Sequence, residues 1–144
     1  MVDENNLEPA PDEFRELFKG QALGHLDEIV TSWRMGGHPI SWSDASANFE
    51  VALETGPVSI FEVLAPSDTH PAGIGYDIAH ALKIGIPTDF ARRIHEELLG
   101  VGKLDEGADG PLRIPLGKFS RGDRKVFLAY TLTVARFLAS NLLK

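Results

Sequence analysis

Apolar residues recur at helical spacing in the first part of the chain, over residues 14–33. Asp12 precedes this pattern as an expected N-cap, and the glycine pair at 36–37 marks its expected end. Gly20 and Gly24 fall inside the pattern, and glycine lowers helix propensity at both positions. The spacing therefore predicts a first helix whose continuity is in question at these two glycines.

The hydrophobic pattern changes to a period of two between Ile40 and Leu64. Three segments are predicted as strands, namely residues 40–42, 49–54 and 58–64. Turn residues separate them, and such short connections favour an antiparallel meander. In the second segment the apolar face alternates with a largely acidic one, so we expect one face of the sheet to contact water.

Two shorter helices are predicted in the middle of the chain. The first begins at Pro71, because proline is tolerated in the first turn of a helix, and it ends at Gly85. The second is capped by Thr88 and ends at Gly100, with charged i,i+4 pairs on its solvent side. Both helices are expected at an edge or end of the sheet.

The last helix is predicted to be broadly apolar. Residues 120–123 open it as an analogue of the capping box, with Asp in place of the usual Glu or Gln. From 126 to 143 its apolar surface extends beyond a single stripe, as in a central helix or an interface. The preceding segment, 100–119, is dense in glycine and proline, so it is expected to be functional, hairpin-like or mobile.

These elements together predict an α+β fold. The expected architecture is a small antiparallel sheet of about three strands, a meander, packed against four helices, with the first and last helices covering one face. Residues 1–11 hold acids, asparagines and prolines without an apolar period, so they are expected to form a disordered acidic tail. Residues 12–144 are expected to form a single α+β domain.

Acidic residues outnumber basic ones, with 21 Asp and Glu against 14 Lys and Arg and a net charge of −7 at pH 7. This charge opposes approach to nucleic acid or an anionic membrane, so neither is an expected partner. No apolar run approaches the roughly 20 residues of a membrane-spanning helix. The amino terminus lacks the basic and apolar regions of a secretory signal, and cysteine is absent. We therefore expect a cytoplasmic protein without disulfides.

The first candidate site contains carboxylate and imidazole groups, at Asp68, His70, Asp77 and His80. Such groups bind divalent metals, or they orient one another as general base and partner. The spacing matches no metal-binding signature, so no metal or cofactor is predicted. The alternative interpretation is structural, with helix caps, a loop histidine and a partly buried, hydrogen-bonded His80.

The second candidate is Gly73-Ile74-Gly75, which follows a predicted strand and opens a predicted helix. In that context exposed backbone N–H groups cradle a phosphate. The dinucleotide-binding fingerprint is incomplete, because Ile78 stands where its third glycine belongs. Close packing at the start of a helix is the alternative.

The third candidate is a group of basic residues in an acidic chain: Arg113, Lys118, Arg121, Arg124 and Lys125. Several lie at the amino end of the last helix, where the helix dipole also favours an anion. A phosphate, a carboxylate ligand or an acidic partner surface would fit them. The alternative is a solvated loop whose charges pair with the acids at 105, 106 and 109.

The fourth candidate is a pair of tryptophans, Trp33 and Trp42, on either side of a Gly-Gly turn. Two indole rings so placed line a ligand pocket or anchor a partner protein, or else they pack a helix onto a sheet.

The leading functional hypothesis is a non-catalytic binding or regulatory module that acts through protein–protein contacts. Its expected partner is another protein or a second copy of the chain, bound through residues 126–143. One alternative is a small metal-dependent or acid/base enzyme that uses Asp68, His70, Asp77 and His80. Another alternative is a binder of a small anionic ligand at the basic residues. No nucleophile elbow, P-loop or zinc signature is present to support an enzyme.

Overall fold

The computed structural model describes residues 11–104 and 110–142. The predicted acidic tail, residues 1–11, lies outside these ranges except for Pro11. Within them the chain forms an α+β fold, with a five-stranded antiparallel sheet and five α-helices. The fold class and the antiparallel meander predicted from the sequence are confirmed.

The sheet has the strand order β1-β2-β3-β4-β5, so each strand pairs with its neighbour in the sequence. Its strands are β1 (Ile40–Trp42), β2 (Ser46–Leu53), β3 (Gly56–Leu64), β4 (Gly73–Tyr76) and β5 (Leu112–Pro115). The first three are the predicted ones. The expected number of about three strands is wrong, because two short strands follow.

The strand β4 occupies residues that the sequence pattern assigns to a helix. The helix predicted over 71–85 begins only at Ile78. Ile74 lies four residues before Ile78, which is the spacing of one helical face, yet it pairs with β3 on one side and β5 on the other. All four β4 residues are buried. Strand pairing on both sides therefore outweighs the local spacing.

The strand β5 comes from the segment 100–119, which the sequence predicts as a loop with a hairpin-like alternative. It pairs antiparallel with β4 and leads into a short 3-10 turn, η2 (Leu116–Lys118). Pro115 is its last residue, and proline is tolerated at the end of an edge strand. A strand of four residues leaves a weak periodic signal, and its position depends on pairing with distant residues.

The helices are α1 (Asp12–Arg15), α2 (Gly20–Met35), α3 (Ile78–Lys83), α4 (Thr88–Gly102) and α5 (Arg121–Leu142). The predicted first helix is broken, because Gly20 adopts a φ of +57°. An ion pair of 2.9 Å between Arg15 and Asp27 then holds α1 against α2.

Two of the three predicted helix caps are wrong. Pro11 and Pro87 occupy the N-cap positions of α1 and α4, in place of Asp12 and Thr88. The third is confirmed in full. The Ser120 N–H donates to Asp123 Oδ2 at 3.0 Å, and the Asp123 N–H donates to Ser120 Oγ at 3.0 Å. This reciprocal pair fixes the start of α5.

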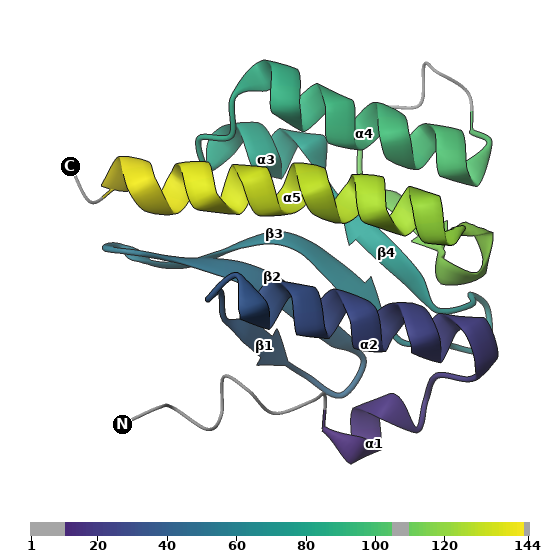
Figure 1. The fold of residues 1–144 in the computed structure, drawn as a ribbon. Coiled ribbons are helices and arrows are strands. Elements are labelled where there is room, and N and C mark those ends of the chain that lie inside the picture. Colours follow the sequence, from purple (N-terminus) through teal and green to yellow (C-terminus); the bar gives the residue numbers. More distant parts are fainter. Residues whose placement is uncertain (1–10, 105–109, 143–144) are drawn as a thin grey trace.

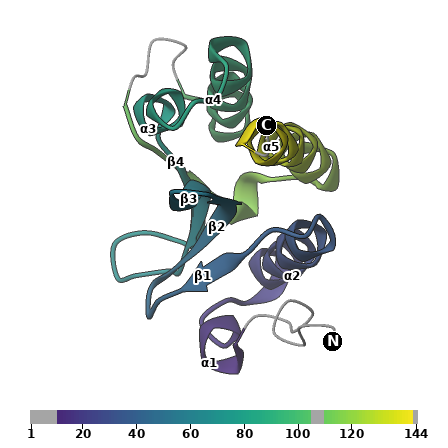
Figure 2. The same cartoon turned by 90° about the vertical axis from the view of Figure 1, so that its left-hand side faces the viewer.

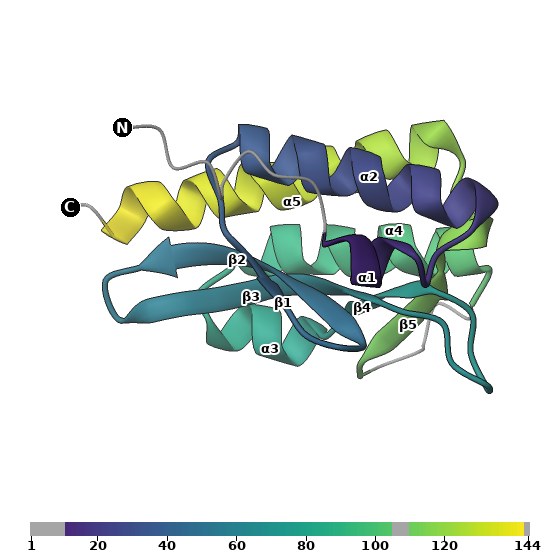
Figure 3. The same cartoon turned by 90° about the horizontal axis from the view of Figure 1, so that it is seen from below.

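The helices form a layer on one face of the sheet. α2 and α5 lie side by side across that face, as predicted for the first and last helices, and α4 extends the layer beside α5 (Figures 1 and 2). α3 packs against α4 at the margin. Figure 3 gives the view from below, in which α2 and α5 run along one side of the strands. For the part of the chain that is described, no helix covers the centre of the opposite face.

The core lies between this helix layer and the sheet, around Trp33. Its indole ring contacts Phe49 and Phe61 edge-on, at centroid distances of 5.9 Å and 5.4 Å. Its Nε1–H donates to the carbonyl oxygens of Pro39 and Glu50, at 3.1 Å each. Trp33 therefore joins α2 to β2 and β3 through both apolar and polar contacts.

The broad apolar surface of α5 is largely covered. α5 packs against α2, α4 and β2, and Phe127, Val134, Ala135 and Leu138 are buried in these contacts. The breadth that motivated the self-association hypothesis is thus explained by packing within the chain, and a dimer through 126–143 stays a prediction. No described helix combines the length and apolar character of a membrane span.

Two glycines of β4 face away from the helices, since Ile74 and Tyr76 point into the core. A Cβ atom added to Gly73 would lie 2.9 Å from the main-chain oxygen of Ile114, which cannot move without disrupting the sheet. A Cβ atom added to Gly75 would lie 2.9 Å from the side chain of Glu62. The open face of β4 thus excludes side chains for two different reasons.

We expect Gly73→Ala to lower the free energy of unfolding by about 1–3 kcal/mol, because overpacking against main chain cannot relax. Gly75→Ala should lower the free energy of unfolding by a smaller amount, because the end of the Glu62 side chain can rotate away from the added Cβ atom. The control is Gly24→Ala in α2, where an added Cβ meets nothing within 4 Å. Gly24→Ala should raise the free energy of unfolding by about 0.5–1 kcal/mol. Urea unfolding of the three variants measures all three values; equal costs at Gly73 and Gly75 would contradict the steric account.

Candidate functional site

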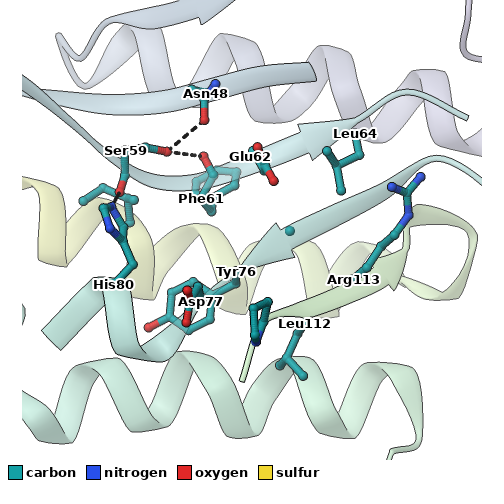
Figure 4. Close-up of a pocket in the computed structure, with 13 residues that line it drawn as sticks. Asn48, Ser59, Phe61, Glu62, Leu64, Tyr76, Asp77, His80, Leu112 and Arg113 are labelled. Carbon is teal, nitrogen blue, oxygen red and sulfur yellow. Dashed lines mark hydrogen bonds between the residues drawn. The ribbon is translucent and has the colours of Figure 1, made fainter. Parts of the chain in front are cut away.

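The open face of the sheet carries a groove of about 450 Å³ (Figure 4). Its floor and walls come from β2, β3, β4, β5 and the start of α3. Polar groups line it at Asn48, Ser59, Glu62, Asp77, His80 and Arg113. A hollow of this size is within the range of small-ligand sites.

Strand register brings these side chains together. Asn48 pairs with Glu62, Glu62 with Gly75, and Gly75 with Arg113, so the four lie in one row across β2 to β5. Side chains alternate along each strand, and the adjacent row of Ala47, Val63, Ile74 and Ile114 is buried under the helices. The polar row therefore faces the open side.

Glu62 lies at the centre of the groove. Its side chain extends over Gly75, whose missing Cβ leaves the space that the carboxylate occupies. Figure 4 places it between the end that holds Ser59 and His80 and the end that holds Arg113. The carboxylate is half-buried, and it forms no hydrogen bond or ion pair with any described residue. It is a central charged group of the groove without a partner among the residues that the structure describes.

Arg113 is partly engaged by the protein itself. Its Nη2 donates to the carbonyl oxygens of Pro71 at 3.0 Å and Ala65 at 3.3 Å, at the two ends of the connection between β3 and β4. Its Nε–H is buried and has no acceptor in the described chain. Burying such a donor unpaired costs about 1–3 kcal/mol. The side chain thus holds the connection in place, and its Nη1 forms no hydrogen bond with the described residues.

The serine and histidine of the groove do not form a nucleophile–base pair. Ser59 Oγ donates to Asn48 Oδ1 at 3.1 Å and approaches the Phe61 carbonyl oxygen at 3.3 Å. His80 Nε2–H donates to the Ser59 carbonyl oxygen at 3.1 Å, and so it contacts main chain instead of the hydroxyl. A nucleophile needs a base within hydrogen-bond distance of its own oxygen.

The remaining polar groups have structural hydrogen bonds. Asp77 Oδ1 accepts from the Ala79 N–H at 3.0 Å and caps α3. The hydroxyl of Tyr76 donates to the Ala91 carbonyl oxygen at 2.9 Å. Burial raises the pKa of Tyr76, and the charge of Asp77 raises it further, so this hydroxyl stays protonated.

The structure separates the four residues of the first candidate site. Asp77 and His80 line the groove, whereas Asp68 and His70 are exposed in the connection between β3 and β4. There His70 Nδ1 contacts Thr69 Oγ1 at 2.9 Å. Over residues 11–104 and 110–142, no group of three or more His, Asp or Glu side chains is arranged to hold a metal ion. Glu62, which sequence reasoning missed, is the second acid that lines the groove.

The phosphate-cradle interpretation of Gly73-Ile74-Gly75 is wrong. These residues form a strand and pair with β3 and β5, so the segment is part of the sheet and does not open a helix. The glycines serve close packing instead, which was the alternative interpretation.

The basic residues of the third candidate do not form one patch. Arg113 lies in the groove, and Lys118 Nζ donates to the Gly102 carbonyl oxygen at 3.4 Å. Arg121, Arg124 and Lys125 line a second hollow between α2 and α5. The acids at 105, 106 and 109, their predicted partners, lie outside the described residues.

A buried histidine supports this second hollow. His25 is 2% exposed, and its Nε2–H donates to the Phe119 carbonyl oxygen at 2.9 Å. The guanidinium of Arg124 donates to His25 Nδ1 at 3.1 Å, which requires the neutral ring. Burial lowers the pKa of His25, and the charge of Arg124 lowers it further, against the opposing effect of the bond to Phe119.

Neither tryptophan of the fourth candidate lines the groove. Trp33 is fully buried in the core. Trp42 is half-buried against Phe14 of α1, and the guanidinium of Arg34 lies 5.8 Å from the centroid of its ring. Both indoles therefore join helices to the sheet.

Comparison of the chain with known protein families, curated proteins and solved structures finds no match.

The His25 contacts predict a pH dependence of stability. As the pH falls below the ordinary value of 6.5, the unfolded chain takes up a proton that folded His25 resists, so the free energy of unfolding decreases. His25→Gln removes this group. We expect the variant to lose less stability than the original chain between about pH 7.5 and about pH 5.5, in urea unfolding.

His38, whose pKa burial also lowers, contributes to both proteins and so cancels from the comparison. Equal losses of stability in the two proteins over this pH range would contradict the role assigned to His25.

Proposed function

We propose that this protein is a non-catalytic binding module that holds a basic side chain of a partner protein in the groove on its open sheet face. The observation that carries the proposal is Glu62. Its half-buried carboxylate has no partner among the described residues and lies over a glycine, with space above it. A lysine or arginine of a partner segment supplies the missing donor.

The walls of the groove fit the rest of such a side chain. Leu64 and Pro111 are the apolar lining residues with exposed surface, and Leu64 lies beside Glu62 (Figure 4). Lysine and arginine carry long aliphatic stems, which pack on apolar surface while the charged end meets an acceptor. An acid at the centre of partly apolar walls is therefore a suitable receptor for these two residues.

The charges favour a partner segment that carries an acceptor beside its basic residue. Asp77 adds a second carboxylate at one end of the groove, whereas Arg113 at the other end has donors left for a carbonyl or carboxylate group. An extended peptide presents both kinds of group. The net charge of −7 also steers basic segments toward the protein.

Selection from a random peptide library displayed on phage tests this proposal. The original chain is the target, and its Glu62→Gln variant is used for counter-selection. We expect enriched peptides to carry lysine or arginine. Synthetic copies of these peptides should bind the Glu62→Gln variant with an affinity lower by about tenfold or more. The reason is that a hydrogen bond to a charged group contributes about 1.5–3 kcal/mol.

Glu96→Gln is the matched control, since Glu96 is an exposed glutamate on α4, outside the groove. It should leave peptide affinity unchanged. Enriched peptides without a basic residue, or peptides that bind the Glu62 variant as well as the original chain, would refute the proposal.

A further inference from the structure

The second hollow lies where two helices begin. α2 and α5 run side by side in the same direction, with both amino termini at the same end of the molecule (Figures 1 and 3). The positive ends of their dipoles therefore add at this end. The hollow has a volume of about 580 Å³ and is lined by residues between 21 and 28 of α2 and between 121 and 125 of α5.

Three cations face one carboxylate in this hollow. Arg121, Arg124 and Lys125 come from α5, and Glu28 comes from α2. None of the three cations forms an ion pair with an acid of the described chain. The protein as a whole has a net charge of −7, so three cations with one neighbouring carboxylate form a locally positive site on a negatively charged protein.

The two helix ends differ in how they are satisfied. At α5 the Ser120 and Asp123 side chains complete the capping box. At α2 the N-cap position is held by Lys19, which makes no capping hydrogen bond, and the first turn contains no acid. The first N–H groups of α2 thus have no side-chain acceptor among the described residues, and Gln21 and Gly24 of α2 line the same hollow as the cations of α5.

Arg124 is held in place before any ligand arrives. Its guanidinium donates to His25 Nδ1, and the ring of His25 is fixed in turn by the Phe119 carbonyl oxygen. His25 is buried at the floor of the hollow. A guanidinium that is already oriented loses less conformational entropy on binding, which favours affinity.

We infer that this hollow is a binding site for the phosphate group of a small phosphorylated ligand. A phosphate monoester carries between one and two negative charges at neutral pH and offers three acceptor oxygens, enough for two guanidinium groups and an ammonium. A carboxylate offers two oxygens and a single charge. An extended nucleic acid would meet the negative charge of the whole protein beyond the hollow.

This site is separate from the groove on the open sheet face. The groove is lined by strands and α3, whereas the hollow lies between α2 and α5, on the other side of the sheet. The two sites share no lining residue. Failure of either assignment therefore leaves the other intact.

Titration of the ¹⁵N-labelled protein with inorganic phosphate and with pyrophosphate tests the inference by NMR. We expect the amide signals of Gln21, Gly24, Arg121 and Lys125 to shift. Arg124→Gln combined with Lys125→Gln should weaken pyrophosphate binding by about tenfold or more. The matched control is Arg92→Gln combined with Arg93→Gln on exposed positions of α4, which should bind as the original chain does.

Glu28→Gln gives a change of opposite sign, because removal of the single carboxylate should tighten binding. Sedimentation with phosphatidylcholine vesicles, with and without a phosphoinositide, distinguishes a lipid headgroup from a soluble ligand as the source of the phosphate. Signals that do not move with either anion, or equal affinities of the hollow and control variants, would overturn the assignment. So would tighter binding of duplex DNA than of pyrophosphate.

Discussion

Strand register is the constraint on which the rest of this structure depends. Across the four strands β2 to β5 it sends Ala47, Val63, Ile74 and Ile114 into the core and the row from Asn48 to Arg113 to the open side. A slip of one residue would reverse both faces. The core requires the apolar row to face α2 and α5. Because side chains alternate along each strand, this requirement also places the polar row on the open face. The groove is thus a consequence of how the core is built.

Local signals in the sequence were sufficient for part of this fold. The alternation in β2 and β3 and the capping box at Ser120 depend on neighbouring residues, and the structure has both. β4 and β5 were not predictable in the same way, because each has four residues and is held by pairing with distant strands. The spacing of Ile74 and Ile78 fits a helix, and only the sheet decides otherwise.

The candidate site was predictable only in pieces. Asp77, His80 and Arg113 appear among the sequence candidates, but in separate groups, because their proximity arises from the pairing of β4 and β5, which the sequence does not reveal. Glu62 lies in a strand predicted to be partly apolar on both faces, and nothing local marks it as central. The same holds for His25, whose link to Arg124 spans most of the chain. Tertiary packing alone unites these residues.

The central claim is that Glu62 receives a basic group in the groove. The most direct measurement is an NMR titration of the ¹⁵N-labelled protein with Nα-acetyl-arginine amide, a ligand with one charge and no other side chain. The account predicts that the backbone amide of Gly75 and the side-chain amide of Asn48 shift, and that Glu62→Gln abolishes both shifts. Signals that move only outside the groove, or that move equally in the variant, would contradict it.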